Sequence, residues 1–206
     1  AVNNPHSGFY QHPTGQFAQY GHYVFTNCWS YDNKVLVIDT QTDQWVDSIE
    51  VLPQPASLVL DTYNKLWVLC DGGSQGNPFA HEKPGLMRID AQTRQVGQVW
   101  RMGLNDMPRA LALNAAGDVL YYINRHVYRL PVTSDQEPEL FIESPYSGHY
   151  AAGFYGLAID PNTDEVYVAD AIDHVQRGAV YRFTPTGQAV DTFKVGIIPS
   201  GFAFDK

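Results

Sequence analysis

Polar side chains recur at the ends of four aromatic–aliphatic segments of this 206-residue chain. A group of amide and carboxylate oxygens suits a hard cation such as calcium, which takes about six to eight oxygen ligands. The same side chains also cap strand ends by bonding nearby backbone, so both interpretations stay open. We predict that the protein binds no metal and no other cofactor. If it did bind a metal, the candidate ligands would be Asn27, Asp71, Asn124 and Asp170.

Two pairs of an imidazole and a carboxylate, His81-Glu82 and Asp173-His174, are also suited to chemistry. Adjacent loop residues seldom direct both groups at one substrate, and the chain contains no Gly-x-Ser-x-Gly motif. The glycines at 72–73 lack the lysine and the helix that a phosphate-binding loop requires. These residues favour a binding protein over an enzyme. The alternative enzyme is a calcium-dependent lactonase or lyase that uses the Asn and Asp side chains.

The elements that position these residues repeat along the chain. Four aromatic-led strands recur at intervals of 44, 54 and 46 residues, the length that a four-stranded propeller blade requires. Turn signals interrupt every helical apolar stripe, so the pattern predicts an all-β fold. The four aromatic-led strands are Tyr23-Val24-Phe25-Thr26, Trp67-Val68-Leu69-Cys70, Tyr121-Tyr122-Ile123-Asn124 and Tyr167-Val168-Ala169-Asp170.

Each repeat predicts four strands, called A to D from the inside outwards. Strand A is rich in alanine and glycine, which suits the crowded centre of a propeller. We predict four blades, and the chain is either a closed ring or the C-terminal part of a seven-bladed propeller. The predicted regions are a leader at 1–19, blades at 20–52, 55–102, 108–143 and 154–196, and a closing inner strand at 199–206. In a closed ring, Ser200–Phe204 would pair with Tyr23–Thr26 and hide two exposed sheet edges.

The connections between the strands differ in length. The A–B and C–D links are tight turns, whereas the B–C and D–A links are longer and carry aromatic, imidazole and carboxylate groups. Such side chains suit a large, flat and partly polar ligand. The alternative is that the aromatic side chains only anchor the loops. The predicted ligand-binding residues are Trp29, Tyr31, Phe79, His81, Tyr146, His149, Tyr150, Asp173 and His174.

Charge and composition exclude several classes of protein. A net charge of −9 and a pI near 5.0, with no basic cluster, argue against nucleic-acid binding. No apolar run reaches the length of a membrane span, and the chain does not begin with the pattern of a signal peptide. We expect Cys28 and Cys70 to be unpaired, because each belongs to a different blade.

Five stretches of the sequence resemble a known family. They are 27–51, 55–73, 82–93, 155–187 and 195–204, and the most specific motifs are VYVADAID, LWVLCDGG and VGIIP. They are similar to the YVTN-type propellers of Bacteroidota cell surfaces. Within this group they most resemble the surface lipoproteins that capture vitamin B12 beside a TonB-dependent cobalamin transporter.

This resemblance implies a function and a location. It implies a non-catalytic propeller that binds cobalamin or another corrinoid, located at the cell surface on the outer membrane and partnered by a TonB-dependent transporter. Family members have seven blades and an acylated N-terminal cysteine, whereas this chain shows four repeats and begins with Ala1. Related propellers also stand beside glycan-uptake systems, so a glycan-binding accessory protein is the alternative within the binding class.

Overall fold

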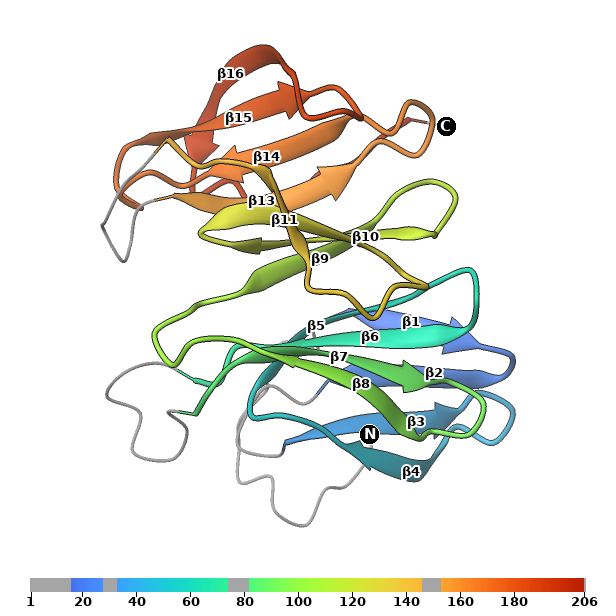
Figure 1. Ribbon diagram of the computed structural model, residues 1–206. Helices are drawn as coiled ribbons and strands as arrows, with labels where there is room; N and C mark the ends of the chain where they lie inside the picture. Colours follow the sequence, from blue (N-terminus) through green and yellow to red (C-terminus); the bar gives the residue numbers. More distant parts are fainter. Residues whose placement is uncertain (1–15, 28–32, 74–81, 146–152, 206) are drawn as a thin grey trace. The chain divides into compact units, whose positions relative to one another are not determined.

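The computed structural model describes residues 16–27, 33–73, 82–145 and 153–205 (Figure 1). These residues form 16 strands and no helix. The chain divides into two compact units, unit 1 (Ala1–Asp106) and unit 2 (Met107–Lys206), and each holds two four-stranded antiparallel sheets. The predicted all-β class and the four repeats of four strands are confirmed. Each sheet is called a blade and numbered in chain order.

In unit 1 the strands of both blades follow one another in space as they do in sequence. Blade 1 consists of β1 (Phe17–Tyr20), β2 (Tyr23–Asn27), β3 (Lys34–Asp39) and β4 (Gln44–Glu50). Blade 2 consists of β5 (Pro55–Leu60), β6 (Lys65–Cys70), β7 (Gly85–Asp90) and β8 (Val96–Arg101).

Unit 2 repeats this topology. Blade 3 consists of β9 (Arg109–Leu113), β10 (Val119–Asn124), β11 (His126–Pro131) and β12 (Glu139–Ile142). Blade 4 consists of β13 (Phe154–Ile159), β14 (Val166–Asp170), β15 (Arg177–Phe183) and β16 (Ala189–Ile197).

The core of each unit lies between its two blades. Strand residues alternate between the two faces of a sheet, so each blade presents one apolar row to its neighbour. In unit 1, Phe25, Val37 and Ile49 of blade 1 pack with Leu58 and Val68 of blade 2. In unit 2 the corresponding core contains Ile123, Val127 and Ile142 of blade 3 and Val166 and Val168 of blade 4.

The first strand of the second blade in each unit packs against the preceding blade. β5 lies against β1 and β2, and β13 lies against β9 and β10. β13 is also approached by the C-terminal segment, because a Cβ added to Gly156 would stand 2.8 Å from the carbonyl oxygen of Ser200. Glycine at this position of an A strand therefore has a steric cause.

Carboxylate or amide side chains that follow the first strands close the A–B turns. Asp61 accepts hydrogen bonds from the backbone N–H of Tyr63 and Lys65 and from the indole N–H of Trp67, each at 2.8 Å. Asn114 accepts hydrogen bonds from two backbone N–H groups of the equivalent turn in blade 3. These contacts confirm that the short turns predicted from Asp and Asn are built by local side-chain bonds.

The pairing of Ser200–Phe204 with Tyr23–Thr26, predicted for a ring that closes within this chain, is wrong. β1 occupies the edge of β2, with Phe17 opposite Thr26 and Tyr20 opposite Tyr23, so that edge is not open to Ser200–Phe204. Residues 17–19, which the sequence assigned to a leader, belong to β1. The two strands join through Gly21 and His22, and Gly21 has a φ of 59°, as a tight hairpin requires. The structure does not test the division into domains, which stays a prediction.

Candidate functional site

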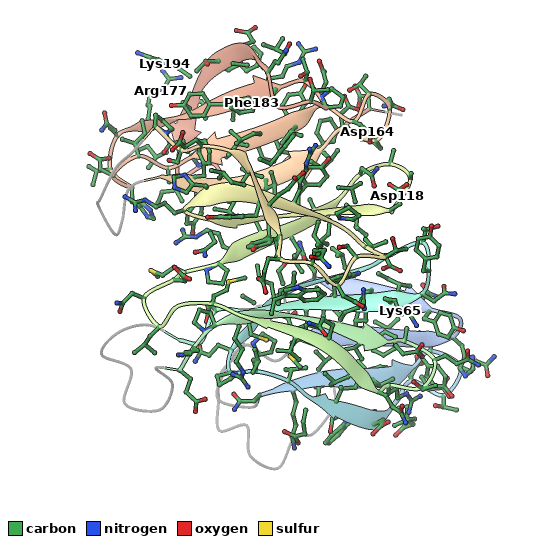
Figure 2. All side chains as sticks on the ribbon, in the orientation of Figure 1. Lys65, Asp118, Asp164, Arg177, Phe183 and Lys194 are labelled. Atoms are coloured by element: carbon green, nitrogen blue, oxygen red, sulfur yellow. The ribbon has the colours of Figure 1, made fainter. Side chains whose placement is uncertain are left out.

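The two ends of the blades in unit 2 carry different connections. Asp118 and Asp164 mark the turn end, where the A–B turns lie, and Arg177 and Lys194 mark the opposite end (Figure 2). This opposite end, called the loop end, holds the B–C and D–A connections. Both Arg177 and Lys194 are exposed, so the loop end of blade 4 presents two cations in a chain of net charge −9.

The B–C loop of blade 4 holds the two predicted ligand-binding residues that the structure describes, Asp173 and His174. Asp173 accepts hydrogen bonds from the backbone N–H of Gln176 at 2.9 Å and of Val175 at 3.0 Å, and these bonds hold the pKa of its carboxyl below the ordinary value. Its second oxygen accepts a bond from the Gln176 side chain at 3.1 Å. Asp173 therefore shapes the loop.

The same loop contains two residues in the left-handed region of backbone conformation. Ile172 has a φ of 54° and His174 has a φ of 63°. A β-branched residue such as isoleucine rarely adopts this conformation, and residues held in such strain gather at binding and switch sites. The buried carboxylate of Asp170 supports the loop by accepting a hydrogen bond from the Ile172 backbone N–H at 2.8 Å. The hydrogen bond to Asp170 thus holds the loop in a conformation that strains its backbone at Ile172 and His174.

His174 belongs to a cluster of three half-buried side chains that we call the Tyr155 cluster. The His174 ring meets the Tyr155 ring edge-on, with centroids 5.3 Å apart and an interplanar angle of 80°. The guanidinium carbon of Arg109 lies 5.2 Å from the centroid of the same tyrosine ring, within cation–π range. The cluster combines an aromatic ring, a permanent cation and an imidazole. It can stack on a flat group and hydrogen-bond to its polar edge.

Sequence reasoning missed Arg109 and Tyr155, which it placed inside small-residue inner strands. Both lie where the pairing register of a first strand shifts: β13 skips Tyr155 between Phe154 and Gly156, and β9 shifts just after Arg109. A β-bulge redirects a side chain, and bulges are common beside functional sites. The available signal was a large side chain at the start of a strand otherwise made of small residues.

The candidate metal ligands in unit 2 contact the protein itself. Asn124 accepts a hydrogen bond from the Met107 backbone N–H at 3.4 Å. Asp170, besides its bond to Ile172, lies 3.5 Å from the Tyr181 hydroxyl. Both contacts match the capping interpretation of the sequence.

The two candidate ligands in unit 1 also bond the backbone at strand ends. Asn27 donates from Nδ2 to the Pro55 carbonyl at 2.7 Å, and Asp71 accepts from the Gly73 N–H at 2.9 Å. The Oδ1 atom of Asn27 is buried and has no hydrogen-bond partner in the part of the chain that the structure describes. In the whole part of the chain that the structure describes, no group of three or more His, Cys, Asp or Glu side chains is placed so that it could hold a metal ion.

The base of the long B–C loop of blade 2 is tightly held. The Gly72 N–H donates to the Pro53 carbonyl at 3.1 Å, and the Glu82 N–H donates to the Gly72 carbonyl at 2.9 Å. Gly72 has a φ of 72°, and a Cβ there would lie only 2.1 Å from the Glu82 carbonyl oxygen. Only glycine fits this position, which brings both ends of the loop together.

The other predicted ligand-binding residues lie outside the described ranges, so their roles stay predictions. These residues are Trp29, Tyr31, Phe79, His81, Tyr146, His149 and Tyr150.

Comparison with known proteins identifies the fold and no family. No family model matches the sequence, and no curated protein is similar to it. Hydrazine synthase of Kuenenia stuttgartiensis is 15% identical with a TM-score of 0.63, and the match covers 87% of this chain and 53% of that chain. The Swd1 β-propeller domain of Myceliophteria thermophila is 11% identical with a TM-score of 0.66, covering 89% and 56%.

These similarities confirm the predicted β-propeller fold. The chain spans little more than half the length of both matched structures. A single fold hosts many unrelated functions, so these similarities establish the fold alone. Among the described residues, no helix is long and apolar enough to cross a membrane.

Proposed function

We propose that this protein is a non-catalytic binding propeller whose ligand is a large, flat molecule with a polar edge. The Tyr155 cluster is the observation that carries this proposal. A bulge directs Tyr155 away from the strand pattern, and Arg109 and His174 flank its ring. Hydrogen bonds to the Asp170 and Asp173 carboxylates fix the loop that holds His174. Such preorganisation lowers the entropic cost of binding.

A corrinoid such as cobalamin is the favoured ligand. A corrin ring offers a broad apolar face surrounded by amide groups, which the tyrosine ring and the flanking nitrogen donors of the cluster complement. The resemblance of five sequence stretches to vitamin B12-binding surface propellers supports the same ligand. We further propose that the protein acts at the outer-membrane surface with a TonB-dependent transporter, as that resemblance implies.

Titration of cyanocobalamin by calorimetry tests the ligand and the site together. We expect Tyr155→Ala to weaken binding by roughly thirtyfold, because a buried aromatic anchor contributes about 2 kcal/mol or more to an interface. Arg109→Gln and His174→Ala should weaken it less. Absence of binding to the wild-type protein overturns the corrinoid assignment.

Two control variants at turns decide whether the loop end is the binding face. Tyr63→Ala removes an exposed aromatic ring from an A–B turn, and Thr163→Ala changes the equivalent turn of blade 4. Neither should change the affinity. If Tyr63→Ala weakens binding as much as Tyr155→Ala, the loop end is the wrong face.

The alternative functions give different results in a thermal-shift screen. A ligand present at about 100 times its Kd stabilises the folded state by about 2.7 kcal/mol. Stabilisation by oligosaccharides and not by corrinoids supports a glycan-binding accessory protein. Stoichiometric, tightly held calcium supports a lactonase or lyase that uses the Asn and Asp side chains.

A further inference from the structure

Residues 199–205 lie on the outward face of blade 4, which is the face that carries Tyr167 and is opposite the core shared with blade 3. They form no strand pairing among the described residues. The Tyr167 ring contacts the rings of Phe202 and Phe204, with centroids 6.1 and 5.3 Å apart. The Asn162 side chain donates to the Asp205 carbonyl at 3.3 Å. Together with the close approach of Ser200 to Gly156, these contacts place the segment along β13 and β14.

This placement repeats that of the first strands in the middle of each unit. β5 lies on β1 and β2, β13 lies on β9 and β10, and residues 200–205 lie on β13 and β14. The entry into the segment is also repeated. Gln54 has a φ of 57° immediately before Pro55, and Ile198 has a φ of 52° immediately before Pro199. A left-handed residue followed by proline therefore begins both β5 and the C-terminal segment.

The C-terminal segment also has the side-chain pattern of a first strand. Phe202 and Phe204 are half-buried against blade 4, whereas Gly201, Ala203 and Asp205 are exposed. This alternation is the period of a β-strand. Asp205 stands where Asp61 and Asp160 stand after β5 and β13, and both of those carboxylates begin an A–B turn.

The outer strand of blade 4 shows that the covering of this face is incomplete. Ile49 of β4 is 5% exposed and Ile142 of β12 is 4% exposed, because the following blade of the same unit covers each of them. Phe193 of β16 is 42% exposed. It precedes Pro199 by six positions, as Ile49 precedes Pro55. Phe193 stands opposite Val180, and both side chains lie on the same face of blade 4 as Tyr167.

We propose that residues 199–205 are the first strand of a further propeller blade. Three further antiparallel strands of the same polypeptide, of the type found in the other blades, pair with the free edge of the segment and cover Phe193. Of the described residues, none forms a backbone–backbone hydrogen bond with 200–205, so that edge is available for pairing. The partner is a polypeptide strand with apolar residues on alternate positions.

A graft taken from the chain itself tests this proposal. Residues 62–102, which follow Asp61 and supply β6 to β8, are appended directly after Asp205. We expect the amides of residues 201–205 to exchange hydrogen at least about tenfold more slowly in the graft than in the 206-residue chain, because they become part of a paired sheet. A second graft, residues 161–197 after Asp205, supplies the strands of blade 4 and guards against failure of one insert to fold.

The matched control is the first graft carrying Phe202→Asp and Phe204→Asp. These changes remove the contact with Tyr167, so the amides should stay in rapid exchange. If both grafts leave residues 201–205 in rapid exchange while blade 4 stays protected, the segment is not a first strand and the proposal is wrong. The amides of residues 201–205 could instead become protected from exchange in the ungrafted chain, and only as the protein concentration rises. This result would mean that a second copy of the chain pairs with the edge, and it also overturns the proposal.

Discussion

Asp61 shows how one buried carboxylate organises a blade. It accepts three hydrogen bonds, two from backbone N–H groups of the turn and one from the indole of Trp67, a side chain with no exposed surface. Asp160 occupies the same position in blade 4, but its side chain accepts one bond, from the Asn162 N–H at 2.8 Å. We therefore expect these two equivalent residues to contribute unequally to the stability of their blades.

We expect Asp61→Ala to lower the free energy of unfolding by about 3 kcal/mol, because it leaves buried donors without an acceptor. Asp160→Ala should cost less than about 1.5 kcal/mol, since one bond is lost at a half-buried site. Urea denaturation of both variants measures the difference. Equal losses in the two variants would contradict a special role for the Trp67 contact.

Cys70 is a second residue whose surroundings determine its chemistry. It has no exposed surface, and burial, followed by the nearby charge of Asp71, raises the pKa of its thiol well above the ordinary value. A buried, protonated thiol is a poor nucleophile. In a Cys28→Ser variant we therefore expect Cys70 to resist a thiol-labelling reagent in the folded protein and to react in urea. Rapid labelling of the folded variant would show that the blade opens easily at this position.

At the scale of elements, an ion pair links neighbouring strands of blade 2. Lys65 of β6 stands opposite Asp90 of β7, with Nζ 2.6 Å from Oδ2. This bond, followed by a hydrogen bond from the Thr93 N–H, lowers the pKa of Asp90 from 3.8 to about 2. A carboxyl whose pKa is lower in the folded state stabilises the fold above pH 3.8 and loses this contribution as the pH falls towards 2.

We expect Lys65→Met to reduce the slope of stability against pH between about pH 4 and pH 2. Both partners are partly exposed, so the effect should stay below about 1 kcal/mol and weaken further in high salt. Urea midpoints measured across this range test it. Lys34→Met removes a lysine of similar exposure from blade 1, together with its ion pair to the exposed Glu50, and controls for the loss of one lysine charge. An unchanged slope in Lys65→Met would mean that the backbone bonds from Gln92 and Thr93 hold the carboxylate without the lysine.

Across the whole molecule, local alternation and turn chemistry predicted the fold well. β6, β10 and β14 follow the predicted aromatic-led strands, and the Asp- and Asn-rich turns lie between strands as expected. β1 was missed because its four residues, FAQY, lack the small-residue pattern of the other first strands. Its short pairing depends on the Gly21-His22 hairpin, a local turn signal that is not part of the blade-length repeat.

The candidate site was less predictable than the fold. Loop composition pointed to His174 but not to Tyr155 or Arg109, because their positions depend on register shifts in β13 and β9. A shift of one residue moves a side chain to the other face of a sheet, and composition does not record it. The predicted partner of the C-terminal segment was wrong, because a sequence pattern suggests a strand without saying which sheet it joins.

The placement of tryptophan has a spectroscopic consequence. All four tryptophans of the chain, Trp29, Trp45, Trp67 and Trp100, belong to unit 1, and two of them stack with their rings 5.3 Å apart beneath Arg88. Tryptophan emission therefore reports the melting of unit 1, whereas far-ultraviolet circular dichroism records the strands of both units. Coincidence of the two signals during denaturation would mean that the units unfold together, and a separation would reveal an intermediate in which one unit remains folded.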